Sequence, residues 1–268
     1  FKVTLILDFM TTDRDFSLRT RRFLLATLTR LGVTVRHQFR SAVDVSTKSN
    51  HHDILTDLDS ALQQQLSQAC LEFLPDSQVF GEEDYAELSL AQIPDEFARA
   101  LQSSPVWIID PIDGTSNFAH GFGFFAISVA LWADGDFVAS AVYNPVTGEM
   151  FSADVAGAYT QQTFDAVEEP LSPAAGRTQR AAALTTSFPH AEILTDSGGL
   201  PLPAASEHLE VFAGLVHEFA SVRRPICASL ELCYAAAGYS DATLAVDSKP
   251  WDAAAGAFIA TQAGAVFT

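Results

Sequence analysis

The chain has 268 residues, 48% of them hydrophobic, which is enough to bury a large core as one domain or as two closely packed halves. Its 33 acidic and 15 basic residues give a formal charge of −18, which argues against nucleic acid or an anionic membrane surface as a partner. No run of about 18 apolar residues occurs, and Asp8 interrupts the short apolar start, so we expect neither a membrane span nor a signal peptide.

The first predicted elements are helices with one polar face. Apolar positions at helical spacing, with arginines between them, predict a helix over residues 16–39. A second helical pattern covers residues 60–73, and Asp59 stands just before it, in the position of an N-cap. His51 and His52 in the connecting segment lack a third soft ligand at a suitable spacing, so we assign them no metal.

Two predicted strands then end on acidic residues. Residues 78–80 form a short strand pattern that is followed directly by the sequence G-E-E-D at residues 81–84. Residues 106–109 are apolar and rich in β-branched side chains, which predicts a buried strand that ends at Asp110. Acids at two strand ends are able to converge if the strands are neighbours.

The second of these strand ends belongs to the sequence D-P-I-D-G-T-S-N at residues 110–117. Pro111 disfavours a helical backbone at Asp110, and Gly114 relaxes the backbone, so we expect a sharp turn that lets Asp110 and Asp113 face one point. Two such carboxylates need a proton or a cation between them, and all-oxygen ligands favour magnesium over zinc. The small side chains, backbone N–H groups and hydroxyl that follow predict an anion-binding turn. Together these features predict a phosphoryl group held between divalent cations and backbone amides and attacked by water.

The remainder of the chain predicts an antiparallel meander followed by alternating strands and helices. The strand patterns of the meander cover residues 122–132, 137–143, 149–153 and 157–159. A segment rich in Pro, Ala, Glu and Ser at residues 165–178 predicts a joint between two subdomains, residues 1–164 and residues 165–268. In the second, strand patterns at residues 180–187, 221–224 and 241–246 alternate with helix patterns at residues 207–218 and 228–237. A further acid, Asp252, stands at the start of an alanine-rich helix.

The cysteines indicate a reducing compartment. Cys70, Cys227 and Cys233 form neither an even framework nor a C-x-x-C motif, and all three lie in apolar, helix-like stretches. We therefore expect buried thiols and a cytoplasmic protein.

Four motifs occur in a fixed order along the chain. They are D-I-L-T-x-x-D at residues 53–59, G-E-E at residues 81–83, D-P-I-D-G-T at residues 110–115 and W-D-A-A-A-G at residues 251–256. Together they resemble the inositol monophosphatase family of magnesium-dependent, lithium-sensitive phosphatases, and the resemblance runs from Lys48 to the end of the chain. It implies a mixed α/β (α+β) fold of two subdomains in an αβαβα layered sandwich, of the inositol monophosphatase and fructose-1,6-bisphosphatase type. It also implies a homodimer and a small phosphorylated metabolite as substrate.

The resemblance further implies a set of site residues. The implied magnesium ligands, shared among two or three ions, are Glu82, Asp110, the backbone carbonyl of Ile112, Asp113 and Asp252. The implied contacts to phosphate and substrate are Asp113, the amides of Gly114 and Thr115, and Ala228. The implied catalytic residues are Glu82, Thr115 and Asp59, with the Thr115 hydroxyl hydrogen-bonded to Asp59 and orienting the metal-activated water for in-line attack. Lys48 matches a loop lysine near the outer metal.

Some positions depart from the pattern of family members that hydrolyse inositol phosphates. Ala245 replaces a carboxylate seven residues before Asp252, and Ile226 and Cys227 alter the small turn ahead of Ala228. Histidinol phosphate, fructose bisphosphate and other sugar phosphates, and 3'-phosphoadenosine 5'-phosphate or other nucleotides therefore remain open as substrates. The resemblance also implies a final strand and helix beyond Thr268, where the printed sequence ends.

Two other function classes remain open. A phosphatase that forms an aspartyl-phosphate is one, although D-P-I-D-G-T is one residue longer than the D-x-D-x-T motif of that chemistry. A metal or phosphate sensor that binds without turnover is the other.

Overall fold

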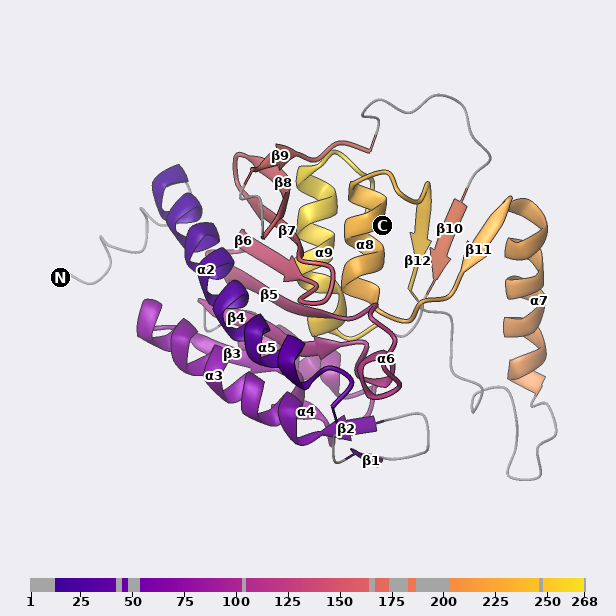
Figure 1. The fold of residues 1–268 in the computed structure, drawn as a ribbon, viewed down its shortest axis with the longest axis horizontal. Helices are drawn as coiled ribbons and strands as arrows, with labels where there is room; N and C mark the ends of the chain where they lie inside the picture. The colour runs from indigo at the N-terminus through magenta and orange to yellow at the C-terminus, as the bar shows by residue number, and fades with distance from the viewer. Residues whose placement is uncertain are drawn as a thin grey trace.

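The computed structural model describes residues 13–41, 45–47, 54–102, 105–163, 167–173, 183–186, 203–245 and 248–267. Lys48, His51 and His52 lie outside the described residues, as does half of the predicted joint at 165–178. Five layers of helix and sheet follow one another across the molecule (Figure 1). They are the helices α2 (Arg14–Gln38) and α3 (Asp57–Phe73), a large sheet, the helices α8 (Ala228–Ala236) and α9 (Pro250–Gln262), a small sheet, and the helix α7 (Pro203–Glu218). The expected αβαβα sandwich is confirmed.

The large sheet has seven strands in the order β3-β4-β5-β6-β7-β8-β9. Its strands are β3 (Gln78–Gly81), β4 (Val106–Asp113), β5 (Ala126–Ala133), β6 (Asp136–Tyr143), β7 (Glu149–Asp154), β8 (Gly157–Gln162) and β9 (Glu169–Pro170). Only β3 and β4 pair in parallel, and every other neighbouring pair in this sheet is antiparallel. The predicted meander is confirmed, although its first strand begins at Ala126 and not at residue 122. Because β3 and β4 are parallel neighbours, the acids that follow them leave the sheet at the same edge.

The expected end of β4 at residue 109, with a sharp turn after it, is wrong. The strand continues to Asp113, with Asp110 opposite Ser128 and Asp113 opposite Ala126, so three residues on β4 span two on β5. This is a β-bulge, and it tolerates Pro111, which has no N–H to donate to a ladder. In a regular strand, residues three apart point to opposite faces. The bulge restores the alternation, so Asp110 and Asp113 lie opposite residues that share one face of β5.

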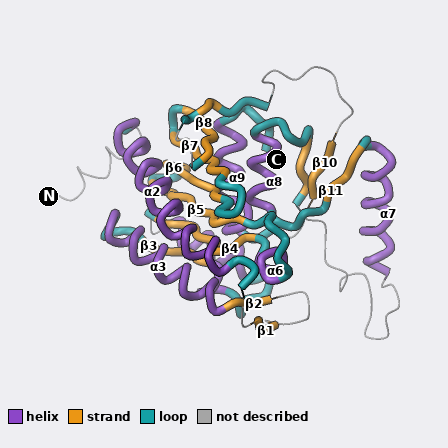
Figure 2. The backbone as a smooth tube through the Cα atoms, in the orientation of Figure 1, coloured by secondary structure: helices purple, strands orange, loops and turns teal. Residues whose placement is uncertain are grey.

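Helices cover both faces of the large sheet (Figure 2). On one face, Leu28 of α2 and Leu66 of α3 pack in a core with Trp107 of β4. On the other face, Ile108 of β4 packs in a core with Trp251 of α9. Strand β4 is therefore buried on both sides, which fixes the position of the acids at its end.

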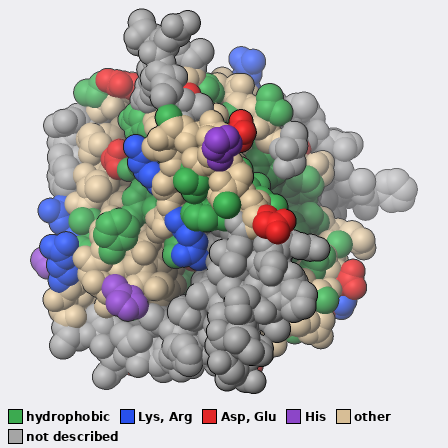
Figure 3. Space-filling view, turned by 90° about the vertical axis from the view of Figure 1, so that its right-hand side faces the viewer, with side chains coloured by type: hydrophobic (Ala, Val, Ile, Leu, Met, Phe, Trp, Pro, Cys, Tyr) green, Lys and Arg blue, Asp and Glu red, His purple; other side chains and the backbone are tan. Residues whose placement is uncertain are grey.

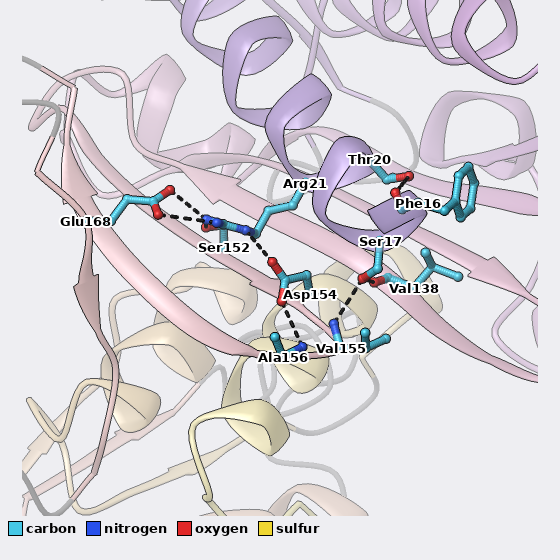
Figure 4. A network of polar contacts seen from close by, with 10 residues as sticks. All are labelled: Phe16, Ser17, Thr20, Arg21, Val138, Ser152, Asp154, Val155, Ala156 and Glu168. Carbon is cyan, nitrogen blue, oxygen red and sulfur yellow. Dashed lines mark hydrogen bonds and ion pairs between the residues drawn. The ribbon is translucent and has the colours of Figure 1, made fainter. Parts of the chain in front are cut away.

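Helix α2 is attached to the sheet by a buried ion pair (Figure 4). Arg21 is 4% exposed, and its Nε donates to Asp154 Oδ2 at 2.8 Å while its Nη1 donates to Glu168 Oε1 at 2.7 Å and to Ser152 Oγ at 3.2 Å. Its guanidinium carbon also lies 4.3 Å from the centre of the Tyr159 ring. A buried arginine with this many partners has its charge and its donors satisfied, so it fixes the helix relative to β7 and β8.

The small sheet is parallel, in the order β11-β10-β12. Its strands are β11 (Ser221–Arg223), β10 (Ala183–Thr186) and β12 (Ala242–Leu244). Strand β11 ends one residue earlier and β12 begins one residue later than predicted, while the residues that flank β10 lie outside the described ranges. Helix α7 begins at Pro203, earlier than predicted. Shorter elements in the described residues add to the core layers: the antiparallel pair of β1 (Val45–Thr47) and β2 (Ile54–Thr56), and the helices α4 (Glu82–Tyr85), α5 (Ile93–Gln102) and α6 (Thr115–Ala119). Helix α5 had no counterpart in the predicted elements. Within the described ranges, none of the helices has the length and apolar character needed to cross a membrane.

Candidate metal and phosphate site

The first acidic strand end is shaped by a glycine. A Cβ at Gly81 would lie 2.5 Å from Cδ of Gln63, so the glycine leaves room for the Gln63 side chain in its present position. Gln63 Oε1 in turn accepts a hydrogen bond from the Glu83 N–H at 2.9 Å. Gln63 thereby sets the direction in which the chain leaves β3 and carries Glu82 toward the end of β4.

Asp110 is the centre of a group of acids. It is 1% exposed, and its Oδ1 has no hydrogen-bond partner. Burial raises the pKa of Asp110 well above its ordinary value, and the charges of Glu82, Asp113, Asp252 and Asp59 raise it further. These five acids come from the ends of β3 and β4 and the first turns of α3 and α9, so the fold brings together the acids that the sequence motifs singled out.

Asp252 is held at the start of α9. Its Oδ2 accepts a hydrogen bond from the Lys249 N–H at 2.9 Å, in a capping arrangement, and Pro250 is suited to the first turn because it needs no donor partner there. Burial raises the pKa of Asp252 to about 8, with further contributions from the charges of Asp113 and Glu82. The side chain that caps this helix is therefore also repelled by the other acids.

Asp113 joins the large sheet to α8. Its Oδ2 accepts a hydrogen bond from the Ser229 N–H at 2.7 Å and lies 3.2 Å from the Cys227 Sγ. Burial raises the pKa of Asp113, and these donors oppose the rise. Cys227, the N-cap residue of α8, makes no side-chain capping bond, so a carboxylate from β4 satisfies the first turn of this helix. Ala228, which was expected near the substrate, is the first residue of α8 and lies in the same turn.

Gly114 and Thr115 form the predicted turn beside these acids. Gly114 has φ +89°, and a Cβ there would lie 3.2 Å from the carbonyl oxygens of both Phe124 and Ile226. Thr115 begins α6 directly after it. A glycine is therefore required both by the left-handed backbone and by the two nearby carbonyls.

The Thr115 hydroxyl does not make the expected bond. It donates its single proton to the Ile112 carbonyl oxygen at 2.9 Å, so it does not donate to Asp59 in this arrangement. Asp59 is also not an N-cap, because α3 begins at Asp57 and Asp59 lies within its first turn, 1% exposed. Asp59 contributes to the site as one of the charges around Asp110.

The described residues fit a hard divalent cation in their chemistry. No three His, Cys, Asp or Glu side chains in the described ranges already lie close enough together to enclose an ion as they stand. Asp113 and Asp252 each turn one oxygen toward an N–H group, as expected for acids that repel one another. The buried Asp110 Oδ1 without a partner, the excess negative charge and the all-oxygen donor set are nevertheless the features that magnesium satisfies.

Two residues of the site, Gln63 and Ser229, were missed from the sequence, and Cys227 was singled out only as an altered position ahead of Ala228, without its contact to Asp113. Gln63 orients the end of β3, while Cys227 and Ser229 hold Asp113. No local pattern marks them, because the partners of Asp113 lie 114 and 116 positions away along the chain.

Comparison with known proteins shows the family and the fold. A model of the inositol monophosphatase family matches residues 19–268. A protein of Aquifex aeolicus named fructose-1,6-bisphosphatase/inositol-1-monophosphatase is 30% identical over 217 residues, which cover 81% of this chain and 72% of the relative. The Nus factor SuhB of Vibrio cholerae is 37% identical over 163 residues, 60% of this chain and 55% of the relative.

Solved structures share the architecture. The extragenic suppressor protein SuhB of Bartonella henselae superposes with a TM-score of 0.72 at 25% identity, covering 92% of this chain and 85% of that one. An IMPase/NADP phosphatase in complex with Mg²⁺ and phosphate superposes with a TM-score of 0.69 at 21% identity, covering 92% and 82%. At 21% identity, this second likeness shows the fold alone.

Proposed function

Since the chain belongs to the inositol monophosphatase family, and so is a phosphoric monoester hydrolase, we propose that its clustered acids hold magnesium and that its substrate is a small phosphorylated metabolite. The observation that carries this proposal is Asp110, a buried carboxylate with an unpartnered oxygen and four other acids near enough to raise its pKa. A charge placed in this way is costly unless a cation neutralises it.

We assign each proposed ligand to an individual magnesium ion. Glu82, Asp110 and the carbonyl of Ile112 would hold one ion, and Asp110 with Asp113 and Asp252 a second, with Glu82 also reaching a third. The Ile112 carbonyl accepts one bond from Thr115 and keeps a second lone pair for this purpose.

The remaining residues would bind the phosphate and orient the attacking water. When bound, magnesium polarises the phosphoryl oxygens and lowers the pKa of the attacking water. The amides of Gly114 and Thr115 would donate to the phosphate, with Ala228 and Asp113 at its edge. Because the Thr115 hydroxyl gives its proton to the Ile112 carbonyl, its lone pairs are left to accept a hydrogen bond from water and so orient it in line with the scissile bond. Asp59 would take the proton that this water loses.

Two positions limit the hydrogen bonds that the site offers to a substrate. Ala245 and Ile226 are apolar, so they offer no side-chain partner for the hydroxyl groups of a polyol. We keep an inositol 1-phosphate-like monoester as the first candidate, with fructose bisphosphate, histidinol phosphate and 3'-phosphoadenosine 5'-phosphate as alternatives. Side chains of both charges lie scattered over the face drawn in Figure 3, among the residues coloured there, without one continuous basic surface for nucleic acid.

We further propose a cytoplasmic homodimer in which residues 1–164 supply most ligands and residues 165–268 supply Asp252. The three cysteines are all buried, free thiols, as expected in a reducing compartment. The apparent mass of the protein in solution tests the dimer.

Phosphate release from the candidate monoesters, with magnesium and with a chelator, tests the function. We expect release that depends on magnesium, is inhibited by lithium at concentrations up to about tens of millimolar, and is lost in Asp113→Asn. Magnesium binding without release from any monoester would favour the sensor. A phosphoenzyme trapped on Asp110 would favour the aspartyl-phosphate chemistry.

A further inference from the structure

One side chain near the site contacts three carbonyl groups. Asn117, in α6, has its Nδ2 2.7 Å from the Phe124 oxygen, 2.6 Å from the Pro225 oxygen and 3.1 Å from the Ile226 oxygen. Pro225 and Ile226 lie 108 and 109 positions further along the chain, in the segment that enters α8. Figure 1 shows α6 beside the end of α8 where this segment arrives. The carboxamide therefore connects the large-sheet part of the molecule to the start of α8.

The segment that Asn117 holds has a strained backbone. Ile226 has φ +56°, in the left-handed region that a β-branched residue rarely adopts. Such a conformation persists only where the surroundings impose it. The Ile226 carbonyl is one of the three that Asn117 contacts, and it also lies 3.2 Å from the position of a Cβ on Gly114. Asn117 and the glycine turn thus both pack against this strained peptide.

The left-handed turn at Ile226 determines which hydrogen-bond donors reach Asp113. The next residues carry the Cys227 Sγ and the Ser229 N–H, the two groups at 3.2 Å and 2.7 Å from Asp113 Oδ2. If Ile226 relaxed to an ordinary extended or helical backbone, the chain after it would leave in another direction. Asp113 would then lose the donors that fix its orientation.

We propose that Asn117 is a positioning residue, whose carboxamide holds Ile226 in the left-handed turn and so keeps the first turn of α8 on Asp113. The inference rests on the proposed function only in taking Asp113 as a magnesium ligand. Asn117 touches neither ion nor substrate in this role, and it acts through the backbone of residues 225–229.

The test uses a variant of the same shape that lacks the donors. Asn117→Asp keeps the side-chain volume and places oxygen against the three carbonyls. Ile226→Gly removes the strain, because glycine adopts positive φ without a Cβ penalty. Asn144→Asp is the matched control, since the Asn144 Nδ2 donates to the Gly123 oxygen at 3.0 Å and this bond stays within the large-sheet part.

Three measurements are made on each variant: hydrogen exchange at the Ser229 amide, calorimetric binding of magnesium alone, and the separate values of kcat and KM. We expect Asn117→Asp to speed exchange at Ser229, to weaken magnesium binding and to lower kcat/KM by about 10²-fold, the scale of a misplaced site. Adding Ile226→Gly should recover at least about fivefold of each loss, since it removes the strain that Asn117 opposes. Asn144→Asp should lower the melting temperature without changing exchange at Ser229.

Absence of any recovery in the double variant would overturn the inference, as would an equal effect of Asn144→Asp on Ser229. If Asn117→Asp does not fold, Asn117→Ala with and without Ile226→Gly gives the same comparison. Should the wild-type protein bind no magnesium and release no phosphate, the proposed function fails, while exchange at Ser229 still decides whether Asn117 holds the turn.

Discussion

Because the clustered acids repel one another, we predict that replacing one of them by its uncharged amide stabilises the metal-free protein. Asp252→Asn keeps an oxygen for the Lys249 N–H and removes one negative charge from beside Asp113 and Glu82. The pKa of Asp252 is raised to about 8 in the folded protein, against about 3.9 in an unfolded chain. The unfolded chain therefore loses this proton first, and stability falls as pH rises from about 4 to about 8.

The size of the effect follows from the proton that Asp252 keeps in the folded wild-type protein. At pH 7 the pH lies about 3 units above the pKa of Asp252 in the unfolded chain, and each unit costs about 1.4 kcal/mol of stability, or about 4 kcal/mol in total. Asp252 is only partly buried, so solvent screening reduces this to about 2 kcal/mol. For a chain of this length, about 2 kcal/mol is a rise in melting temperature of about 4–8 °C.

The assay is thermal and urea unfolding in the presence of a chelator at pH 5 and at pH 7.5. We expect Asp252→Asn to be more stable than wild type at pH 7.5 and nearly equal to it at pH 5. Magnesium at 100 times its dissociation constant should stabilise wild type by about 2.7 kcal/mol and the variant by much less. Asp154→Asn is the control of opposite sign, because Asp154 pairs with Arg21 and its loss should destabilise at both pH values. A less stable Asp252→Asn at pH 7.5 would refute the view that these acids repel one another.

Three further predictions concern single residues. Arg21→Met should cost about 3–5 kcal/mol of unfolding free energy, because it leaves Asp154 buried without its partner, and should leave kcat of the surviving folded enzyme unchanged. Gly114→Ala should cost about 1–3 kcal/mol and most of the phosphate release, since a Cβ meets two carbonyls at 3.2 Å and φ is +89°. Thr115→Val should lower kcat by about 10²–10⁴-fold, while Thr115→Ser should keep kcat within about tenfold of wild type, as measured by steady-state phosphate release.

Each of these has a result that contradicts it. Normal melting of Arg21→Met would mean that α2 is held by its apolar contacts alone. Full activity of Gly114→Ala would show that the turn does not need a left-handed residue. Equal kcat for the valine and serine variants at position 115 would remove the hydroxyl from the reaction.

The layers of the fold and the full set of converging acids were expected from the family resemblance, whereas local patterns alone predicted the strand end and the helix start that carry some of these acids. An apolar β-branched run that stops at a carboxylate, as at Asp110, is a local pattern, and so is an acid at the start of an alanine-rich helix, as at Asp252. The bulge at Pro111 was not predictable, because it is a relation between β4 and β5 that appears only when the two strands are paired.

Contacts between segments far apart in the chain were also not predictable from the sequence. Asn117 resembles any polar residue of a turn until residues 225 and 226 are placed beside it. The Thr115 hydroxyl was assigned the wrong partner because the motif fixes residue types and leaves open which of two nearby oxygens receives one proton. Helix α5 was missed although it carries local signals of a helix: Pro94 and two acids in its first turn, Arg99 in its last turn, and an amphipathic pattern between them.

The contact between Asp113 and the first turn of α8 also has a meaning for biosynthesis. A ribosome releases Asp113 long before Ser229, which follows 116 positions later. During that interval the nascent chain carries its acids with no donor on Asp113 and without Asp252 nearby. The second proposed ion, which would need Asp252, is therefore expected to bind only after α9 has been synthesised, whereas the first proposed ion would need only residues made before Asp113.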